Sequence, residues 1–367
     1  VGFDAGLSVS TGIQNTIIGG LAGDALTIGA ENVVLGYNAF TTANTNESGN
    51  VAIGANSLLN LDNGVTAYTY NTAVGYNSAV TTGVQNTLIG GLAGDALTTG
   101  AQNTAMGYGA LSSEDANGRN TAIGYGTLNL LNAGAEGFNT AVGDLAGTAM
   151  TTGVQNTIIG ALAGDAITSG SFNQAHGYNA LGAETGASRS TAIGYYALAT
   201  QNVGSGEANN VAIGHAAGLS ITSGTTNTLI GNQAGDALTT GSSNTAIGKG
   251  ALGAEDTLDG NTAVGYSALL LQDGGSQNTA LGYQAGDIVS TGDNNTLLGA
   301  GAGDNLNTGS NNTLIGASSG DVLAGGNNNT CIGRDTTFAG ASDSSSIIIG
   351  ESVTGLGSNS TVIGTGS

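Results

Sequence analysis

Asn71-Thr72-Ala73-Val74-Gly75 and Asn312-Thr313-Leu314-Ile315-Gly316 are two copies of one phrase, Asn-Thr-apolar-apolar-Gly. The chain contains 21 such phrases, and from Gly214 to Gly350 their closing glycines recur at a constant step. A fixed period, here of about 17 residues, is typical of one structural unit stacked on itself. A short β-branched apolar run closed by glycine indicates a strand followed by a turn. The sequence therefore predicts an all-β parallel β-roll, or β-solenoid, of about 21 coils, which would form a rod.

A second period is superimposed on the first. Gly19, Gly90, Gly160 and Gly231 head coils that end in Ala-Gly-Asp, and each lies four coils after the one before. Residues 1–289 are thus predicted to hold four super-repeats, and residues 290–367 plainer terminal coils, in one repetitive domain spanning 1–367. The extra residues fall at one step of the super-repeat, which predicts loops on one face of the solenoid. These loops are residues 58–70, 127–138 and 197–207.

Each coil is expected to hold two short strands, the phrase and a second run such as Ala96-Leu97-Thr98-Thr99-Gly100. In the phrase, Thr and the second apolar residue share one side of the strand. Val replaces this Thr at Val33, Val51 and Val211, which predicts a half-buried position. The residue between them, often Ala, is expected on an outer face that partner chains cover. Small side chains there would allow close approach at a shared axis, which predicts a homotrimer.

The Asn that opens each phrase is predicted to form a ladder from coil to coil. Stacked side-chain amides can hydrogen-bond along the solenoid axis and so satisfy a buried polar row. We therefore interpret this column as structural. Its clearest members are Asn71, Asn86, Asn103, Asn120, Asn139 and Asn156.

Composition narrows the possible partners. The chain has 67 glycines and no proline, as expected where every backbone N–H serves a β-ladder. Four Lys and Arg residues stand against 25 Asp and Glu, a net charge of −21. This charge argues against nucleic-acid binding and against attraction to an anionic membrane, and favours a role in keeping the protein soluble. No apolar run is long enough to predict a membrane span.

The residue types that usually carry catalysis or hold metals are sparse. His176 and His215 lie far apart in the chain at different coil positions, with no carboxylate cluster joining them. The single cysteine, Cys331, occupies an apolar strand position and is interpreted as a small buried hydrophobe. We therefore predict no catalytic residues, no metal ligands and no cofactor, and expect a non-enzymatic protein.

Eight tyrosines each follow a closing glycine of the phrase. Such a row could form a platform for carbohydrate, because a tyrosine ring offers an apolar face and a polar tip. It could equally pack at the seam between chains of a trimer, and both interpretations stay open. The residues are Tyr37, Tyr76, Tyr108, Tyr125, Tyr178, Tyr195, Tyr266 and Tyr283.

Three acidic residues near the C-terminus share one coil phase. Asp287, Asp304 and Asp321 come from successive coils and would lie about 5 Å apart if the turns stack. Like charges at that distance repel unless they are screened or bridged. Calcium could bridge them with turn carbonyl groups. The alternative is that the turns are fully solvated and bind no ion.

The motifs also resemble a known family. Residues Asn71 to Ala79, and in part Asn261 to Leu269, resemble head-region repeats of trimeric autotransporter adhesins, and still more the related repeats of bacteriophage tail-fibre and virion-fibre proteins. Ser346 to Gly350 and Gly357 to Gly364 are similar to the short coils that end such rods. The resemblance implies a left-handed parallel β-roll, a homotrimer and a role in surface attachment. The adhesin repeat is shorter than the coil found here.

The expected function is a fibre shaft or attachment rod on a virion, outside the cell, with copies of itself and a cell-surface glycan or receptor as partners. It is not expected to bind nucleic acid or insert into a membrane. An alternative is a bacterial extracellular adhesin, or a filament that polymerises end to end, because Val1-Gly2 and Gly364 look like cut coils with open strand edges. A minor alternative is an ice-binding solenoid. Val interrupts the Thr column, and the super-repeat loops are expected to break its flatness.

Overall fold

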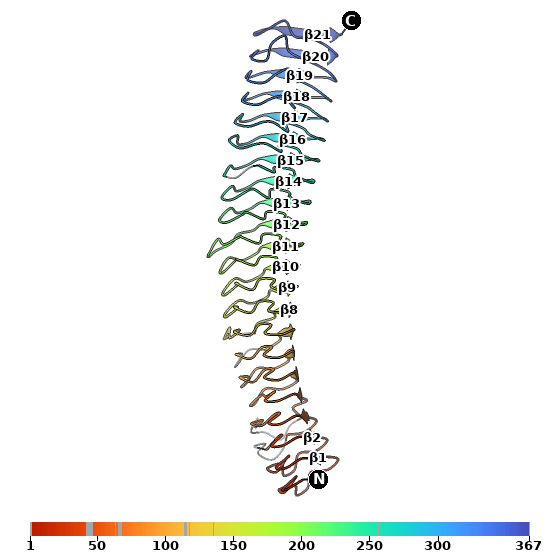
Figure 1. The fold of residues 1–367 in the computed structure, drawn as a ribbon, viewed down its shortest axis with the longest axis vertical. Coiled ribbons are helices and arrows are strands. Elements are labelled where there is room, and N and C mark those ends of the chain that lie inside the picture. Colours follow the sequence, from red (N-terminus) through yellow and green to blue (C-terminus); the bar gives the residue numbers. More distant parts are fainter. Residues whose placement is uncertain are drawn as a thin grey trace. The chain divides into compact units, whose positions relative to one another are not determined.

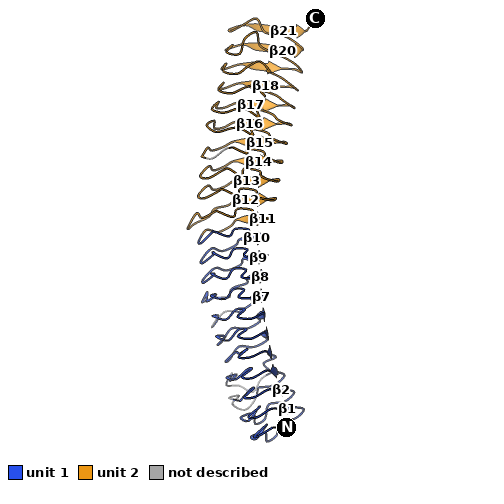
Figure 2. Ribbon diagram, viewed as in Figure 1, with its two compact units in different colours: residues 1–186 blue, residues 187–367 orange. Residues whose placement is uncertain are grey.

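In the computed structural model, residues 2–41, 47–62, 64, 68–113, 116, 118–134, 136–254 and 257–366 are described. The chain divides into two compact units, residues 1–186 and 187–367 (Figure 2). Each unit is a parallel β-solenoid in which every coil contributes one short strand, stacked on the next (Figure 1). The described residues form strands and turns without a helix, so the predicted all-β solenoid is confirmed. Parts of the predicted loops at 58–70 and 127–138, and Val1, lie outside the described residues.

The strands follow the phrase, and most are three residues long. The first unit contains β1 (Thr16–Ile18), β2 (Val33–Leu35), β3 (Val51–Ile53), β4 (Thr72–Val74), β5 (Thr87–Ile89), β6 (Thr104–Met106), β7 (Thr121–Ile123), β8 (Thr140–Val142), β9 (Thr157–Ile159) and β10 (Gln174–His176). The second contains β11 (Thr191–Ile193), β12 (Val211–Ile213), β13 (Thr228–Ile230), β14 (Thr245–Ile247), β15 (Thr262–Val264), β16 (Thr279–Leu281), β17 (Thr296–Leu298), β18 (Thr313–Ile315), β19 (Thr330–Ile332), β20 (Ile347–Glu351) and β21 (Thr361–Thr365).

Within each unit, consecutive strands pair in parallel and in register. Thr72 lies beside Thr87, and Ala73 beside Leu88, so equivalent positions of the phrase form straight columns. The register also holds across the longer step between β3 and β4, where Val51 lies beside Thr72. An insertion in the connecting segment therefore leaves the strand ladder unchanged.

The prediction of two strands per coil is wrong. Leu97, in the expected second strand, forms only an isolated bridge with Val80. Between strands the chain instead makes successive tight turns, in which Leu92 and Gly94 have φ angles of 59° and 61°. Left-handed residues at such short intervals reverse the chain before a second strand can extend. The coils still hydrogen-bond to one another here, as the Thr81 N–H does to the Leu97 carbonyl at 3.0 Å.

The interior of each coil is built from the middle strand residue, which corrects the predicted facing. Ala73 and Leu88, at the centres of β4 and β5, are fully buried within one chain. The Thr and the third strand residue point outward instead, and Ile18 and Leu281 remain 45% and 46% exposed. Both sides of the strand carry apolar residues, so hydrophobicity did not identify the inner side. The narrow interior of the coil is filled by the middle strand residue, which is Ala in some coils and a larger residue in others.

Part of the super-repeat has a packing explanation. Where the middle strand residue is large, as at Leu88, the turn carries Gly94, and a Cβ placed there would lie 2.8 Å from a Leu88 methyl group. Where it is small, as at Ala105, the turn carries the buried Leu111. In these coils a large side chain occupies either the strand or the turn, as close packing of the interior favours. Other coils depart from this pattern. Ala141 and Gly147 are both small, and a Cβ at Gly147 would lie 2.9 Å from a methyl group of Leu128, so a side chain of the neighbouring coil fills that space.

Candidate binding surfaces

The predicted Asn column lies inside the solenoid, and its members are at most 1% exposed. The Asn86 backbone N–H donates to Oδ1 of Asn71 at 2.9 Å, and its Nδ2 donates to the Gly100 carbonyl at 2.9 Å. The same backbone bond joins Asn103 to Asn86 and Asn120 to Asn103. These amides are occupied by the next coil, so the column holds coils in register and offers nothing to a ligand.

The outward side of the strands forms a surface without charge. We call it the strand face and define it as the first and third residues of each strand from β1 to β21. The first residue is mostly Thr, and the third is mostly Ile, Val or Leu. None of the 25 acidic and four basic residues of the chain occupies either position. The strand face of each unit is therefore a half-exposed stripe of threonine and apolar side chains.

All eight predicted tyrosines are exposed, in a column just beyond the strand face. Several pair with the ring of the neighbouring coil. Tyr108 and Tyr125 have ring centroids 5.8 Å apart with planes 12° from parallel, and Tyr266 and Tyr283 have centroids 5.3 Å apart at 11°. In the second unit His215 stacks on Tyr195 at 5.4 Å. Aromatic pairs of this kind therefore occur in both units.

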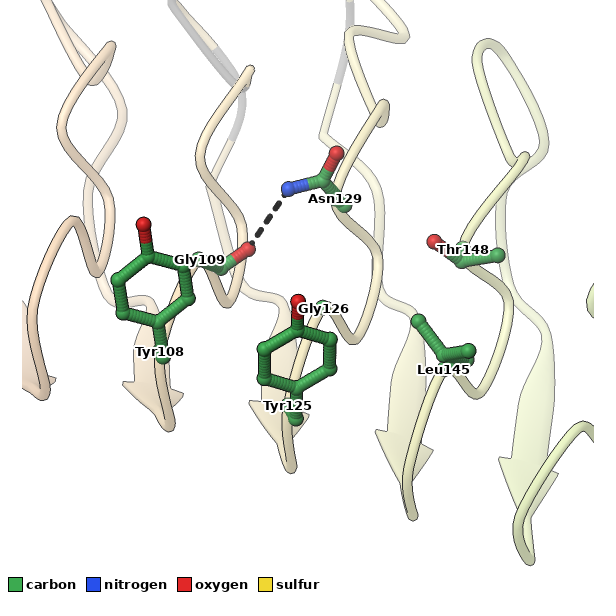
Figure 3. Close-up of a pocket in the computed structure, with 7 residues that line it drawn as sticks. All are labelled: Tyr108, Gly109, Tyr125, Gly126, Asn129, Leu145 and Thr148. Atoms are coloured by element: carbon green, nitrogen blue, oxygen red, sulfur yellow. Dashed lines mark hydrogen bonds between the residues drawn. The ribbon is translucent and has the colours of Figure 1, made fainter.

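The pair of Tyr108 and Tyr125 borders a groove of about 160 Å³ (Figure 3). Both rings turn a face toward the same side, and Asn129 lies above them. Leu145 and Thr148, from the coil of β8, close the groove beyond Tyr125. The Nδ2 group of Asn129 donates to the Gly109 carbonyl at 3.0 Å and to Oγ of Ser112 at 2.6 Å, which fixes the amide over the groove.

Two glycines that sequence reasoning missed leave this groove open. Gly109 and Gly126 directly follow the two tyrosines and have φ angles of 63° and 57°. At the equivalent positions after Tyr266 and Tyr283 the chain carries Ser267 and Gln284, which adopt similar positive φ angles. The backbone is therefore similar at the two tyrosine pairs. The pair of Tyr108 and Tyr125 differs because residues 109 and 126 have no side chain. The sequence signal that could have revealed these glycines is Gly-Tyr-Gly, at residues 107–109 and 124–126.

Burial and neighbouring charge both act in the acidic turn column, which we define as Asp287, Asp304 and Asp321. Burial first, and then the charge of Asp321, raise the pKa of Asp304 from 3.8 to about 6. Burial likewise raises the pKa of Asp287. Asn305 Nδ2 donates to Oδ1 of Asp321 at 2.9 Å, which ties the two turns together. In the described part of the chain, no group of three or more His, Cys, Asp or Glu side chains could hold a metal ion. Calcium bridging at Asp287, Asp304 and Asp321 stays a prediction.

The two histidines and the cysteine belong to different coils. His176 is the third residue of β10, and His215 lies against Tyr195. Cys331, the middle residue of β19, is fully buried, and burial raises the pKa of its thiol. Across the described residues, no helix is long and apolar enough to cross a membrane. Comparison with known proteins adds no assignment, since no family model matches the chain and no curated protein matches it.

Proposed function

We propose that the chain is a non-catalytic segment of an extracellular attachment fibre, such as a virion or tail-fibre shaft, in which copies of the chain associate through their strand faces. The observation that carries the proposal is the uncharged strand face on a chain of net charge −21. The resemblance to phage fibre repeats supports the same function.

Charge restricts how copies of this chain can meet. Surfaces that carry many carboxylates repel one another, so close association of two copies is unfavourable over most of the molecule. The strand face brings no carboxylate into such a contact. It also exposes apolar side chains in a continuous stripe, of which Ile247 and Leu281 are 37% and 46% exposed. Extended apolar stripes of this kind mark interaction surfaces.

A second copy of the chain is the partner that this stripe fits. Its side chains repeat with the coil spacing of about 4.8 Å, and another solenoid with the same coil spacing can match it coil by coil. Threonine and β-branched side chains are short and stiff, so ordering them at an interface costs little entropy. The homotrimer predicted from the sequence is our proposed arrangement, with three strand faces meeting around one axis.

Native mass spectrometry tests the assembly. We expect three copies for the unmodified chain and dissociation for the double variant Ile247→Lys with Leu281→Lys, since buried unpaired lysines are costly at an interface. Thr240→Lys, on an exposed turn, is the matched control and should leave the trimer intact. Circular dichroism should show folded coils in all three proteins. A stable unmodified monomer would contradict the proposal. Electron microscopy would separate rods of fixed length from an end-to-end filament.

The strand face also favours a second function, ice binding. The first strand residues form a Thr column beside an apolar column, and the strands stay in register across the longer step between β3 and β4. A thermal-hysteresis assay decides between the two. Clear activity of a monomer would favour ice binding, whereas a trimer without activity would favour the fibre.

A further inference from the structure

We infer that the groove beside Tyr108 and Tyr125 binds a neutral oligosaccharide, with the two rings as its stacking platform. The inference rests on the attachment role proposed above, because an attachment fibre needs a ligand on the surface that it contacts. It goes further by naming the site and the chemical class of the ligand.

The rings provide the apolar part of the site. Tyr108 and Tyr125 are 56% and 58% exposed, and their planes lie within 12° of each other. Figure 3 shows the two ring faces side by side and turned to the same side of the molecule. A sugar ring presents a face of C–H groups, and an aromatic face is the apolar surface that such a face packs against. Two adjacent tyrosine faces can therefore take two successive sugar units.

Polar atoms surround the platform. The hydroxyl groups of Tyr108 and Tyr125 and the Oγ1 atom of Thr148 have no hydrogen-bond partner among the described residues. The same holds for Oδ1 of Asn129, whose amide is held over the groove by its two bonds through Nδ2. Sugar hydroxyl groups both donate and accept hydrogen bonds, so hydroxyl and amide groups beside an apolar platform suit them.

The charge of the site selects among polar ligands. The groove is lined by Tyr108, Gly109, Tyr125, Gly126, Asn129, Leu145 and Thr148, with no basic side chain. The next coil places the carboxylate of Asp144 at the position that follows Tyr125 in the column. An anionic glycan or a nucleic acid would meet repulsion here and from the net charge of −21. A neutral glycan meets no such penalty.

The chain contains its own control for this site. Tyr266 and Tyr283 form an equivalent ring pair, but Ser267 and Gln284 stand where Gly109 and Gly126 leave space. The Lys249 Nζ also lies 6.0 Å from the centre of the Tyr266 ring. If an exposed ring pair were sufficient, both pairs would bind. If the open groove is required, only the pair of Tyr108 and Tyr125 would bind.

The test is calorimetric titration of the folded chain with cellohexaose, maltohexaose, laminarihexaose and chitohexaose, and with hexagalacturonate as the anionic probe. We expect at least one neutral probe to bind and the anionic probe not to bind. Tyr108→Ala with Tyr125→Ala should weaken binding by about tenfold or more, from lost ring contact. Tyr266→Ala with Tyr283→Ala should leave it unchanged. Gly109→Ser should also weaken binding, since Ser267 shows that this backbone accepts serine.

Native mass spectrometry of the same proteins separates this inference from the fibre proposal. Trimers that bind none of the neutral probes would overturn the glycan site and leave the fibre intact. A monomer that binds them through Tyr108 and Tyr125 would support the site and contradict the fibre assembly. Dissociation of the trimer in the Tyr108→Ala and Tyr125→Ala variant would place these rings in the seam between chains, and would also overturn the site.

Discussion

The strand side of each coil repeats almost without change, whereas the turn side varies in length, size and charge. The Asn ladder bonds across steps of 15, 17 and 21 residues with the same distance of 2.9 Å from the backbone N–H to Oδ1. The turn side carries the insertions, the tyrosine pairs and the acidic column. The Asn ladder fixes the geometry of the strand side, because each of its side chains hydrogen-bonds to the neighbouring coil. Turns facing solvent are free to differ.

The sharpest test compares a glycine from each side. Gly265 closes the phrase of β15 with a φ angle of 141°, and a Cβ there would collide with the Gly282 carbonyl oxygen. We expect Gly265→Ala to lower the free energy of unfolding by about 4 kcal/mol or more. Gly204, in the loop of residues 197–207, has open space within 4 Å of the point where a Cβ would stand. Gly204 has a φ angle of 82°, so Gly204→Ala should still cost about 1–2 kcal/mol through the left-handed backbone alone. Urea unfolding of both variants measures the difference.

The Asn ladder should give the next largest effect. Asn278 donates to the Gly292 carbonyl at 2.7 Å and accepts from the backbone and side chain of Asn295 at 2.9 and 3.0 Å. Asn278→Ala would leave these buried groups unpaired, at a cost of about 3 kcal/mol. Asn232→Ala, on an exposed turn, is the control and should change the free energy of unfolding by under about 1 kcal/mol. Equal effects of the two substitutions would refute a special role for the strand side.

A third prediction tests the packing link between the two sides. Leu229, the middle residue of β13, is fully buried, and Leu229→Ala should cost about 2–3 kcal/mol through the cavity that it leaves. A Cβ at Gly235 would lie 2.8 Å from the Leu229 side chain. Gly235→Ala should therefore lower the free energy of unfolding less in the Leu229→Ala variant than in the unmodified chain. A double-mutant cycle by denaturant unfolding measures this coupling, and simple additivity would contradict it.

The smallest expected effect is the pH dependence of the acidic turn column. The pKa of Asp304 is raised from 3.8 to about 6, so the folded state binds more protons than the unfolded state between these values. Stability should therefore rise as the pH falls from about 7 toward 4, and this contribution is lost as the pH rises through 6. Asp304→Asn should reduce the response. Melting curves at pH 5 and 7.5 for both proteins would show it, and identical pH responses would argue against a raised pKa of Asp304.

The sequence alone determined the periodic features of this protein. The coil period, the strand positions, the closing glycines and the Asn column all follow from a pattern that a stacked β-structure imposes on every coil. The ladder requires the same residue at the same phase, so its members can be recognised without coordinates. Even the phase of the insertions was visible, because they lengthen only one step of the super-repeat.

Only the tertiary structure decided which side of the strand faces inward and which part of the coil is turn. Side chains alternate between the two sides of a strand, but the sequence does not say which side is inner when both are apolar. In the folded coil the interior is narrow, and the middle strand residue fills it. The second expected strand became turns because left-handed residues close the coil too tightly. The groove beside Tyr108 and Tyr125 was also not visible in sequence, because it depends on side chains that Gly109 and Gly126 lack and on neighbouring coils that only the fold brings together.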